Sequence, residues 1–167
     1  MLKLEKAAKQ AVRPPALPRM EKSPFQPEAE GTPVEVVGGN RSILVVDDNE
    51  VVLKAFELRL KASGFAVTAT SNAATVASMA ETARAELIIL DINFPSGSGP
   101  DWSGFTVIQW LRRFPELAVI PVILISGEDS EAHREKARAE GVVAFFPKPV
   151  NYPELLAVML RTLGIRQ

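Results

Sequence analysis

Three aspartates, one serine and one lysine each stand at or just beyond the end of a short apolar run in this sequence. They are Asp47, Asp48, Asp91, Ser126 and Lys148. Carboxylates that converge on one point repel each other unless a cation is present. Oxygen ligands without histidine or cysteine suit Mg²⁺ or Mn²⁺, and Mg²⁺ commonly binds one or two carboxylates together with a phosphate. The lysine could neutralise a phosphoryl group and the serine could hydrogen-bond it, so these residue types predict phosphoryl chemistry once a fold brings them together.

The apolar runs alternate with segments of helical periodicity from residue 42 onward. We expect strands at residues 43–46, 65–69, 87–90, 120–125 and 142–146, and helices at residues 49–61, 73–83, 105–114, 130–140 and 152–163. The run 87–90 is wholly apolar, as in a parallel strand that is buried on both faces. Five β–α units predict an α/β fold with a doubly wound, five-stranded parallel sheet flanked by five helices. Ligands bind such sheets beyond the carboxyl ends of the strands, where the five polar side chains would meet.

Four motifs, in this order along the chain, resemble those of response-regulator receiver domains. They are Ile-Leu-Val-Val-Asp-Asp at 43–48, Leu-Ile-Ile-Leu-Asp at 87–91 with Pro95, Ser-Gly at 126–127 and Lys-Pro at 148–149. The resemblance covers most of the chain, from Ser42 to Leu163. It implies a flavodoxin-like (CheY-like) fold with strand order 2-1-3-4-5, and a receiver module of a two-component phosphorelay.

The resemblance also implies a role for each residue of the site. Asp91 would be the phosphoacceptor, which attacks a phosphohistidine carried by a histidine kinase or a histidine phosphotransfer protein. Asp48 would bind Mg²⁺ (or Mn²⁺) directly, Asp47 partly through water, and Asn93 through its backbone carbonyl, with Asp91 completing the metal site. Lys148 would pair with Asp91 at rest and with the phosphoryl oxygens afterwards. Such a module catalyses its own phosphorylation and dephosphorylation only.

Two further positions would form a switch by the same resemblance. Ser126 would be drawn toward the phosphoryl group, which vacates space that Phe145 can fill. We expect the Lys148–Pro149 bond to be cis, as it commonly is in receiver domains. The signal would leave through contacts with a downstream protein, and the face made by residues 130–140, 142–146 and 152–163 could also form a homodimer.

Simpler explanations exist for single residues. The Asp47–Asp48 pair could be only a helix N-cap, Ser126 a structural turn hydroxyl, and Phe145 an ordinary core aromatic.

The helix at 130–140 offers mainly three alanines for packing, Ala132, Ala137 and Ala139, so we expect it to be mobile. The one histidine of the chain, His133, lies in a charged stretch of this helix and is expected to be solvated.

Three other functions compete with the phosphoacceptor. One is an adaptor that keeps the receiver fold and never carries phosphate. Another is a Mg²⁺-dependent phosphatase with an aspartate nucleophile, but Asn93 stands where such enzymes commonly have a second acid. The third is a nucleotide-binding α/β domain, which would need a glycine-rich turn after the first strand, where Asp47-Asp48-Asn49 stands instead.

Composition narrows the class of protein further. A net charge of -1 gives no reason to expect a nucleic-acid partner. The absence of cysteine excludes disulfides and thiolate metal sites, and it fits a cytoplasmic location. No apolar run is long enough to span a membrane, so we expect no membrane association.

Two regions fall outside the expected α/β pattern. Prolines are concentrated between Pro14 and Pro33, so we interpret residues 1–40 as a flexible extension and residues 41–167 as the receiver domain. Residues 33–37 could add an edge strand, although a linker is the simpler interpretation. Residues 96–103 form an insertion relative to the receiver pattern, beside the expected site, and an exposed Trp102 there would favour a partner contact.

Overall fold

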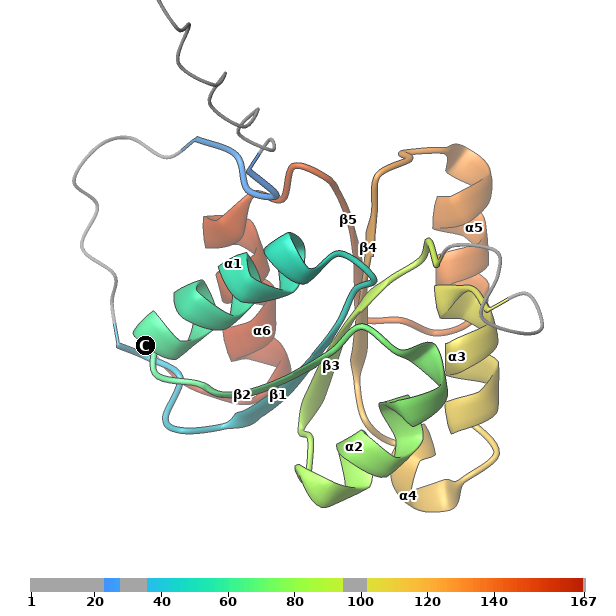
Figure 1. Ribbon diagram of the computed structural model, residues 1–167, viewed down its shortest axis with the longest axis horizontal. Coiled ribbons are helices and arrows are strands. Elements are labelled where there is room, and N and C mark those ends of the chain that lie inside the picture. Colours follow the sequence, from blue (N-terminus) through green and yellow to red (C-terminus); the bar gives the residue numbers. More distant parts are fainter. Residues whose placement is uncertain (1–22, 28–35, 95–101, 167) are drawn as a thin grey trace, which may run out of the picture.

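Five parallel strands form the centre of the molecule, which the computed structural model describes for residues 23–27, 36–94 and 102–166 (Figure 1). The strands lie in the order β2-β1-β3-β4-β5, which confirms the expected α/β fold and strand order. Their bounds are β1 Ser42–Val46, β2 Ala66–Thr70, β3 Leu87–Asp91, β4 Val122–Ser126 and β5 Ala144–Pro147. The strand expected from residue 120 begins at Val122, because Pro121 has no N–H to donate to the sheet. The Pro121 carbonyl instead accepts a hydrogen bond from Ile88.

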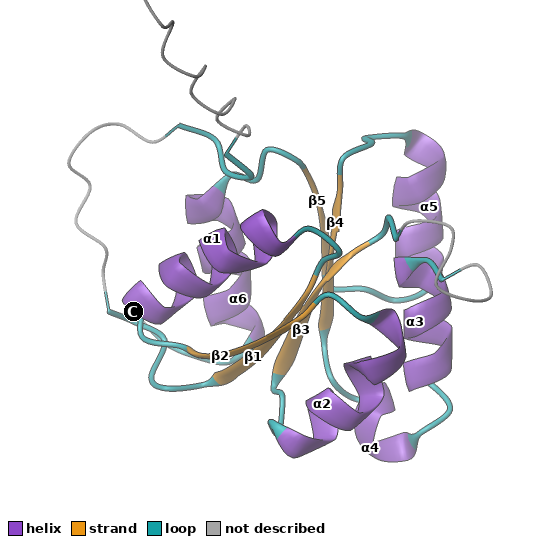
Figure 2. Cartoon of the chain, in the orientation of Figure 1, coloured by secondary structure: helices purple, strands orange, loops and turns teal. Residues whose placement is uncertain are grey.

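Helices cover both faces of the sheet (Figure 2). On one face, α1 (Glu50–Ala62) and α6 (Tyr152–Thr162) pack on strand residues such as Ile43, Ile89 and Ile123. Successive strand residues point to opposite faces. The next residue of each strand, such as Leu44, Leu90 or Leu124, therefore belongs to the second apolar layer.

The second face carries the remaining helices. They are η1 Ala73–Thr75, α2 Val76–Thr82, α3 Gly104–Leu111, α4 Pro115–Ala118 and α5 Glu131–Ala139. The expected helix at 105–114 is shorter than predicted, and the short α4, which was not expected, follows it. Pro115 begins α4 because its fixed φ suits the first position of a helix.

The packing of α5 differs from the expectation. Only Ala137 of its three candidate alanines is buried, since Ala132 and Ala139 are exposed. His133 is half-buried rather than solvated, with its ring 6.0 Å from that of Phe105. Residues four apart share a helix face, so His133 faces the domain together with Ala137. Its Nδ1 is buried without a hydrogen-bond partner among the described residues.

Part of the N-terminal extension packs on the domain instead of forming a free tail. In the short segment 23–27, Phe25 is buried and forms an isolated parallel bridge with Val150. Val36 and Val37 form no strand, and residues 33–35 and the rest of the extension lie outside the described residues. In the described part of the chain, no helix is both long and apolar enough to cross a membrane.

Candidate functional site

The carboxylates of Asp47, Asp48 and Asp91 lie together at the carboxyl ends of β1 and β3. One oxygen of each lies within 4.8 Å of the others. Strand pairing explains this proximity, because Val46 of β1 lies opposite Leu90 of β3 and the next residues along the chain are Asp47 and Asp91. Asp47 and Asp91 are buried, with 3% and 4% of their surface exposed, whereas Asp48 is exposed. The structure therefore brings the three predicted acids to one place.

Lys148 reaches this acidic cluster from the loop between β5 and α6. Its Nζ donates hydrogen bonds to Asp47 Oδ2 at 2.7 Å and to Asp91 Oδ2 at 3.1 Å. Its backbone N–H donates to the Ser126 carbonyl at 2.7 Å, and the Lys148–Pro149 bond is cis, as expected. The predicted pairing with Asp91 is present, and Asp47 shares the same ammonium group.

The helix-cap explanation for the acid pair is wrong. The N-cap of α1 is Asn49, whose side chain accepts hydrogen bonds from the N–H groups of Val51 and Val52. Asp47 Oδ1 accepts from the Asn49 N–H at 2.9 Å, which orients this carboxylate, while its Oδ2 binds Lys148. Both acids are thus outside the cap and belong to the site.

Burial and charge act in opposite directions on these groups. Burial raises the pKa of Asp91 from 3.8 to about 6; the Lys148 charge lowers it and the Asp47 charge raises it. Burial also raises the pKa of Asp47, against the effect of its hydrogen bond to Lys148. Burial acts to lower the pKa of Lys148, but hydrogen bonds and charge from Asp47 and Asp91 outweigh it and the pKa is raised. A positive charge at this site is therefore favourable.

The expected switch residues, Ser126 and Phe145, lie on neighbouring strands. Ser126 is fully buried, and its Oγ accepts a hydrogen bond from the Glu128 N–H at 3.0 Å. Ser126 lies opposite Pro147 of β5, and Phe145 precedes Pro147 by two residues. Residues two apart on a strand share a face, so the side chains of Ser126 and Phe145 lie on the same side of the sheet.

Arg134 of α5 covers the outer side of Phe145, a contact that sequence reasoning missed. Its guanidinium carbon lies 5.1 Å from the centre of the Phe145 ring, which is half-buried. Arg134 Nε also donates to Asp129 Oδ1 at 2.6 Å, in the loop that follows Ser126. The sequence shows opposite charges at Asp129 and Arg134, on either side of a helix start. Whether Arg134 reaches Phe145 depends on which side of α5 faces the sheet, and the sequence does not give that orientation.

Asn93 and Gly104 lie next to the expected phosphoacceptor. Asn93 is exposed, donates its N–H to Asp91 Oδ1 at 3.3 Å and forms an isolated antiparallel bridge with Ser103. Gly104 donates its N–H to the Ile92 carbonyl at 2.8 Å, and a Cβ at this position would lie 2.5 Å from the Asp91 carbonyl oxygen. Only glycine therefore allows α3 to start so close to β3.

Most of the predicted insertion lies outside the described residues, which resume at Trp102. The Trp102 ring lies 6.0 Å from that of Trp110, and both residues are half-buried. Trp102 is therefore not the fully exposed side chain that would have favoured a partner contact.

The donor set fits a divalent cation that prefers oxygen ligands. Three carboxylates face one ammonium group, so the cluster lacks positive charge. Exposed Asp48 offers an oxygen on the solvent side, and buried Asp47 and Asp91 offer oxygens on the protein side. No histidine or cysteine belongs to the cluster, which favours Mg²⁺ or Mn²⁺ over softer metals.

Comparisons with known proteins agree with this geometry. Residues 43–160 match the family model of the response regulator receiver domain. The chain is 32% identical over 124 residues to the polar-differentiation response regulator DivK of Brucella anthropi, a match that covers 74% of this chain and 97% of the relative.

Solved structures of response regulators are also similar to this chain. A response regulator from Desulfuromonas acetoxidans is 31% identical with a TM-score of 0.65, over 74% of this chain and 97% of that one. A response regulator receiver protein from Pseudomonas putida is 28% identical with a TM-score of 0.65, over 73% of this chain and 97% of that one. Family model, sequence relatives and acidic pocket together show that this chain belongs to the response regulator receiver domain family of two-component signalling.

Proposed function

We propose that this protein is a phosphoacceptor of a two-component phosphorelay, in which Asp91 takes a phosphoryl group from a phosphohistidine. The observation that carries the proposal is the Lys148 ammonium, which contacts both Asp47 and Asp91 beside the third carboxylate, Asp48. Membership of the receiver family implies a kinase partner. The donor is a histidine kinase or a histidine phosphotransfer protein, and the protein acts in the cytoplasm.

In the transfer, the protein itself forms one covalent bond, between Asp91 and the phosphorus. An Asp91 oxygen attacks the phosphorus, an O–P bond forms, and the P–N bond of the donor breaks with its electron pair staying on the imidazole nitrogen. Mg²⁺ held by Asp47, Asp48, Asp91 and the Asn93 carbonyl would neutralise charge on the phosphoryl oxygens. The nearby Lys148 ammonium then turns from the Asp91 carboxylate to one of these oxygens.

The output is a switch in the packing around Phe145. The Ser126 hydroxyl donates a hydrogen bond to a phosphoryl oxygen, which favours a second position of the β4–α5 loop. Asp129 of this loop binds Arg134, and Arg134 covers Phe145, so a displaced loop pulls on the contact that holds the ring. The small buried area of α5 makes its rearrangement inexpensive. A downstream protein would recognise the rearranged face.

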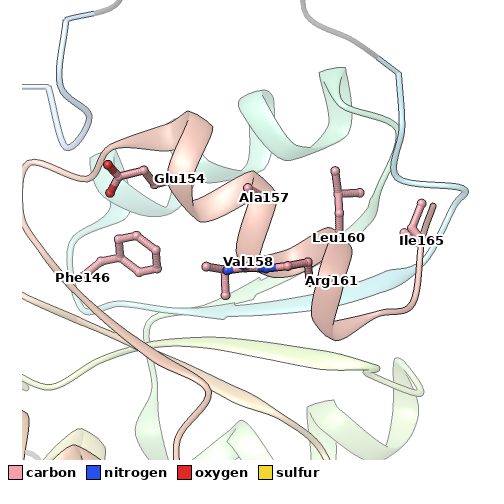
Figure 3. Close-up of a pocket in the computed structure, with 7 residues that line it drawn as sticks. All are labelled: Phe146, Glu154, Ala157, Val158, Leu160, Arg161 and Ile165. Carbon is pink, nitrogen blue, oxygen red and sulfur yellow. The ribbon is translucent and has the colours of Figure 1, made fainter. Parts of the chain in front are cut away.

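The face made by α5, β5 and α6 is also proposed to form a homodimer. A surface cavity of about 550 Å³ lies between Phe146 of β5 and α6 (Figure 3), and none of the three clustered aspartates lines it. Apolar side chains such as Phe146 and Val158 line it, with Glu154 and Arg161 among its charged lining residues. In a two-fold dimer each contact occurs twice. Glu154 of one copy could therefore meet Arg161 of the other, and sedimentation of the phosphorylated protein at several concentrations would detect this association.

Phosphorylation by a small donor tests the proposal directly. The full chain is incubated with acetyl phosphate and Mg²⁺, and we expect the mass of one phosphoryl group to be added to the wild type and not to Asp91→Asn. Glu116→Gln, an exposed acid on α4 away from the acidic cluster, is the control and should be modified like the wild type. A wild type that is not modified, and that does not bind beryllofluoride with Mg²⁺, would instead favour an adaptor that never carries phosphate.

A further inference from the structure

A short N-terminal segment occupies a groove between α1 and α6. It is the blue piece of ribbon beside the start of α6 in Figure 1. Only 5% of Phe25 is exposed, and its ring lies 4.6 Å from that of Phe56 in α1 and 5.6 Å from that of Tyr152 in α6, edge-on in both cases. The Phe25 ring thus fills the space between two helices that start at the site.

The groove provides polar contacts as well as apolar ones. The guanidinium carbon of Arg59 lies 4.9 Å from the centre of the Phe25 ring and 4.4 Å from that of Tyr152. The Tyr152 hydroxyl donates to the Arg59 carbonyl at 3.1 Å and shares a 2.8 Å hydrogen bond with the buried Ser63 hydroxyl. The hydroxyls of Tyr152 and Ser63 therefore have hydrogen-bond partners, as buried polar groups in folded proteins generally do.

The backbone of the segment bonds to the loop that carries Lys148. The Val150 N–H donates to the Pro24 carbonyl at 2.8 Å, and the Gln26 N–H donates to the Val150 carbonyl at 3.0 Å. Val150 is fully buried and lies two residues after Lys148. If the segment left, a buried N–H would lose its partner, which is costly enough that the loop would rearrange or admit water.

The position of the groove ties this contact to the chemistry. α1 begins at Glu50, directly behind the Asp47–Asp48 pair, and α6 begins at Tyr152, behind Lys148. Phe25 contacts both helices at once, so it connects the helix that follows the acids with the helix that follows Lys148.

We propose that residues 24–26 are a positioning element of the phosphoacceptor site, which holds the Lys148 loop so that its ammonium reaches Asp47 and Asp91. This inference rests on the proposed function. It gives the segment a role that a tether would not have, because the contacts are made with the site loop and not only with the outer surface of a helix.

The first experiment uses Phe25→Ala in the full chain, with acetyl phosphate and Mg²⁺. We expect phosphorylation of Asp91 to slow by roughly tenfold, since small misplacements of a positioned group can cost about 100-fold in rate. Phe25→Leu keeps an apolar side chain in the groove and should recover much of the rate. Leu117→Ala, a buried change on the opposite face of the sheet, is the control for lost stability and should leave the rate unchanged.

The second variant, Gln26→Pro, keeps Phe25 and removes the N–H that bonds to Val150. We expect a smaller slowing, of a few fold, together with faster hydrogen exchange at the Val150 amide. The third measurement places Phe25→Ala in a Lys148→Met background and compares beryllofluoride affinities. If Phe25 acts through Lys148, adding Phe25→Ala to Lys148→Met should not change the beryllofluoride affinity further.

The outcomes separate the inference from the proposed function. A Phe25→Ala protein that is phosphorylated at the wild-type rate while its Val150 amide exchanges faster would overturn the positioning role alone. An undiminished effect of Phe25→Ala in the Lys148→Met background would do the same, because it would show a general loss of structure. A wild type that is never phosphorylated would overturn the proposed function.

Discussion

Arg134 lies over the Phe145 ring at 5.1 Å and binds Asp129 at 2.6 Å, which links the position of Phe145 to the loop after Ser126. A cation over an aromatic ring is attracted to its face. The contact is available to the resting packing and would be lost when Phe145 moves inward. If Phe145 switches as proposed, this contact would oppose the change.

Removal of this contact should favour the phosphorylated packing. We expect Arg134→Ala to bind beryllofluoride with Mg²⁺ about two- to fivefold more tightly than the wild type, because a contact specific to the resting packing is gone. Arg138→Ala removes a neighbouring exposed pair with Glu131 and is the matched control. Equal affinities of Arg134→Ala and wild type, measured by fluorescence titration, would show that the contact does not oppose switching.

The raised pKa of Asp91 predicts that its charged form lowers the stability of the fold, so this effect depends on pH. The pKa is 3.8 ordinarily and about 6 in the folded protein, so the folded protein holds this proton more tightly than the unfolded chain does. The group therefore stabilises the fold below about pH 4, and this contribution is lost as the pH rises through about 6. Asp91→Asn without divalent cations should be about 1–3 kcal/mol more stable than the wild type near pH 8, with little difference near pH 4.

Urea unfolding between these pH values would check this prediction. Glu116→Gln, an exposed acid on α4, serves as the control and should not change the pH dependence. Added Mg²⁺ should reduce the advantage of Asp91→Asn. An advantage that is constant with pH would contradict a role of the Asp91 charge.

Lys148 should have opposite effects on metal binding and on phosphorylation. Lys148→Met leaves three carboxylates without the ammonium, so we expect Mg²⁺ to bind roughly tenfold more tightly. Phosphorylation should nevertheless slow, because the phosphoryl oxygens lose their cationic partner. Lys54→Met, an exposed lysine of α1, is the control. Weaker Mg²⁺ binding by Lys148→Met in a calorimetric titration would show that the lysine does not compete with the cation.

The close approach of Gly104 to Asp91 predicts that a larger residue at position 104 destabilises the fold. A Cβ in Gly104→Ala would lie 2.5 Å from the Asp91 carbonyl oxygen and 2.9 Å from the Ile92 Cα, so β3 and α3 must separate. We expect a loss of about 1–3 kcal/mol in unfolding free energy. Gly127→Ala, where a Cβ would meet nothing within 4 Å, is the matched control. Similar stabilities of the two variants would indicate that the start of α3 adjusts freely.

The acidic site was predictable because strand ends are visible in the sequence. A wholly apolar run such as 87–90 indicates a central parallel strand, and parallel strands bring Asp47 and Asp91 to one edge. Sequence also indicated that Lys148 would reach Asp91. It did not indicate that Asp47 would share the ammonium at a shorter distance, which depends on the path of the loop.

Contacts made by isolated residues were not predictable. Phe25 stands alone among prolines, without the repeated spacing that marks a core element, so nothing in the sequence separates it from a linker. His133 was assigned to solvent because its neighbours are charged, and the rotation of α5 decided otherwise. The short α4 begins at Pro115, and a single proline favours a helix start only where the chain already turns. The sequence alone does not show that the chain turns there.

The pairing of Asn93 with Ser103, together with the bond from the Gly104 N–H to the Ile92 carbonyl, ties the start of α3 to the residues that follow Asp91. A displacement of the chain just after Asp91 is therefore passed to the first turn of α3 through direct contacts.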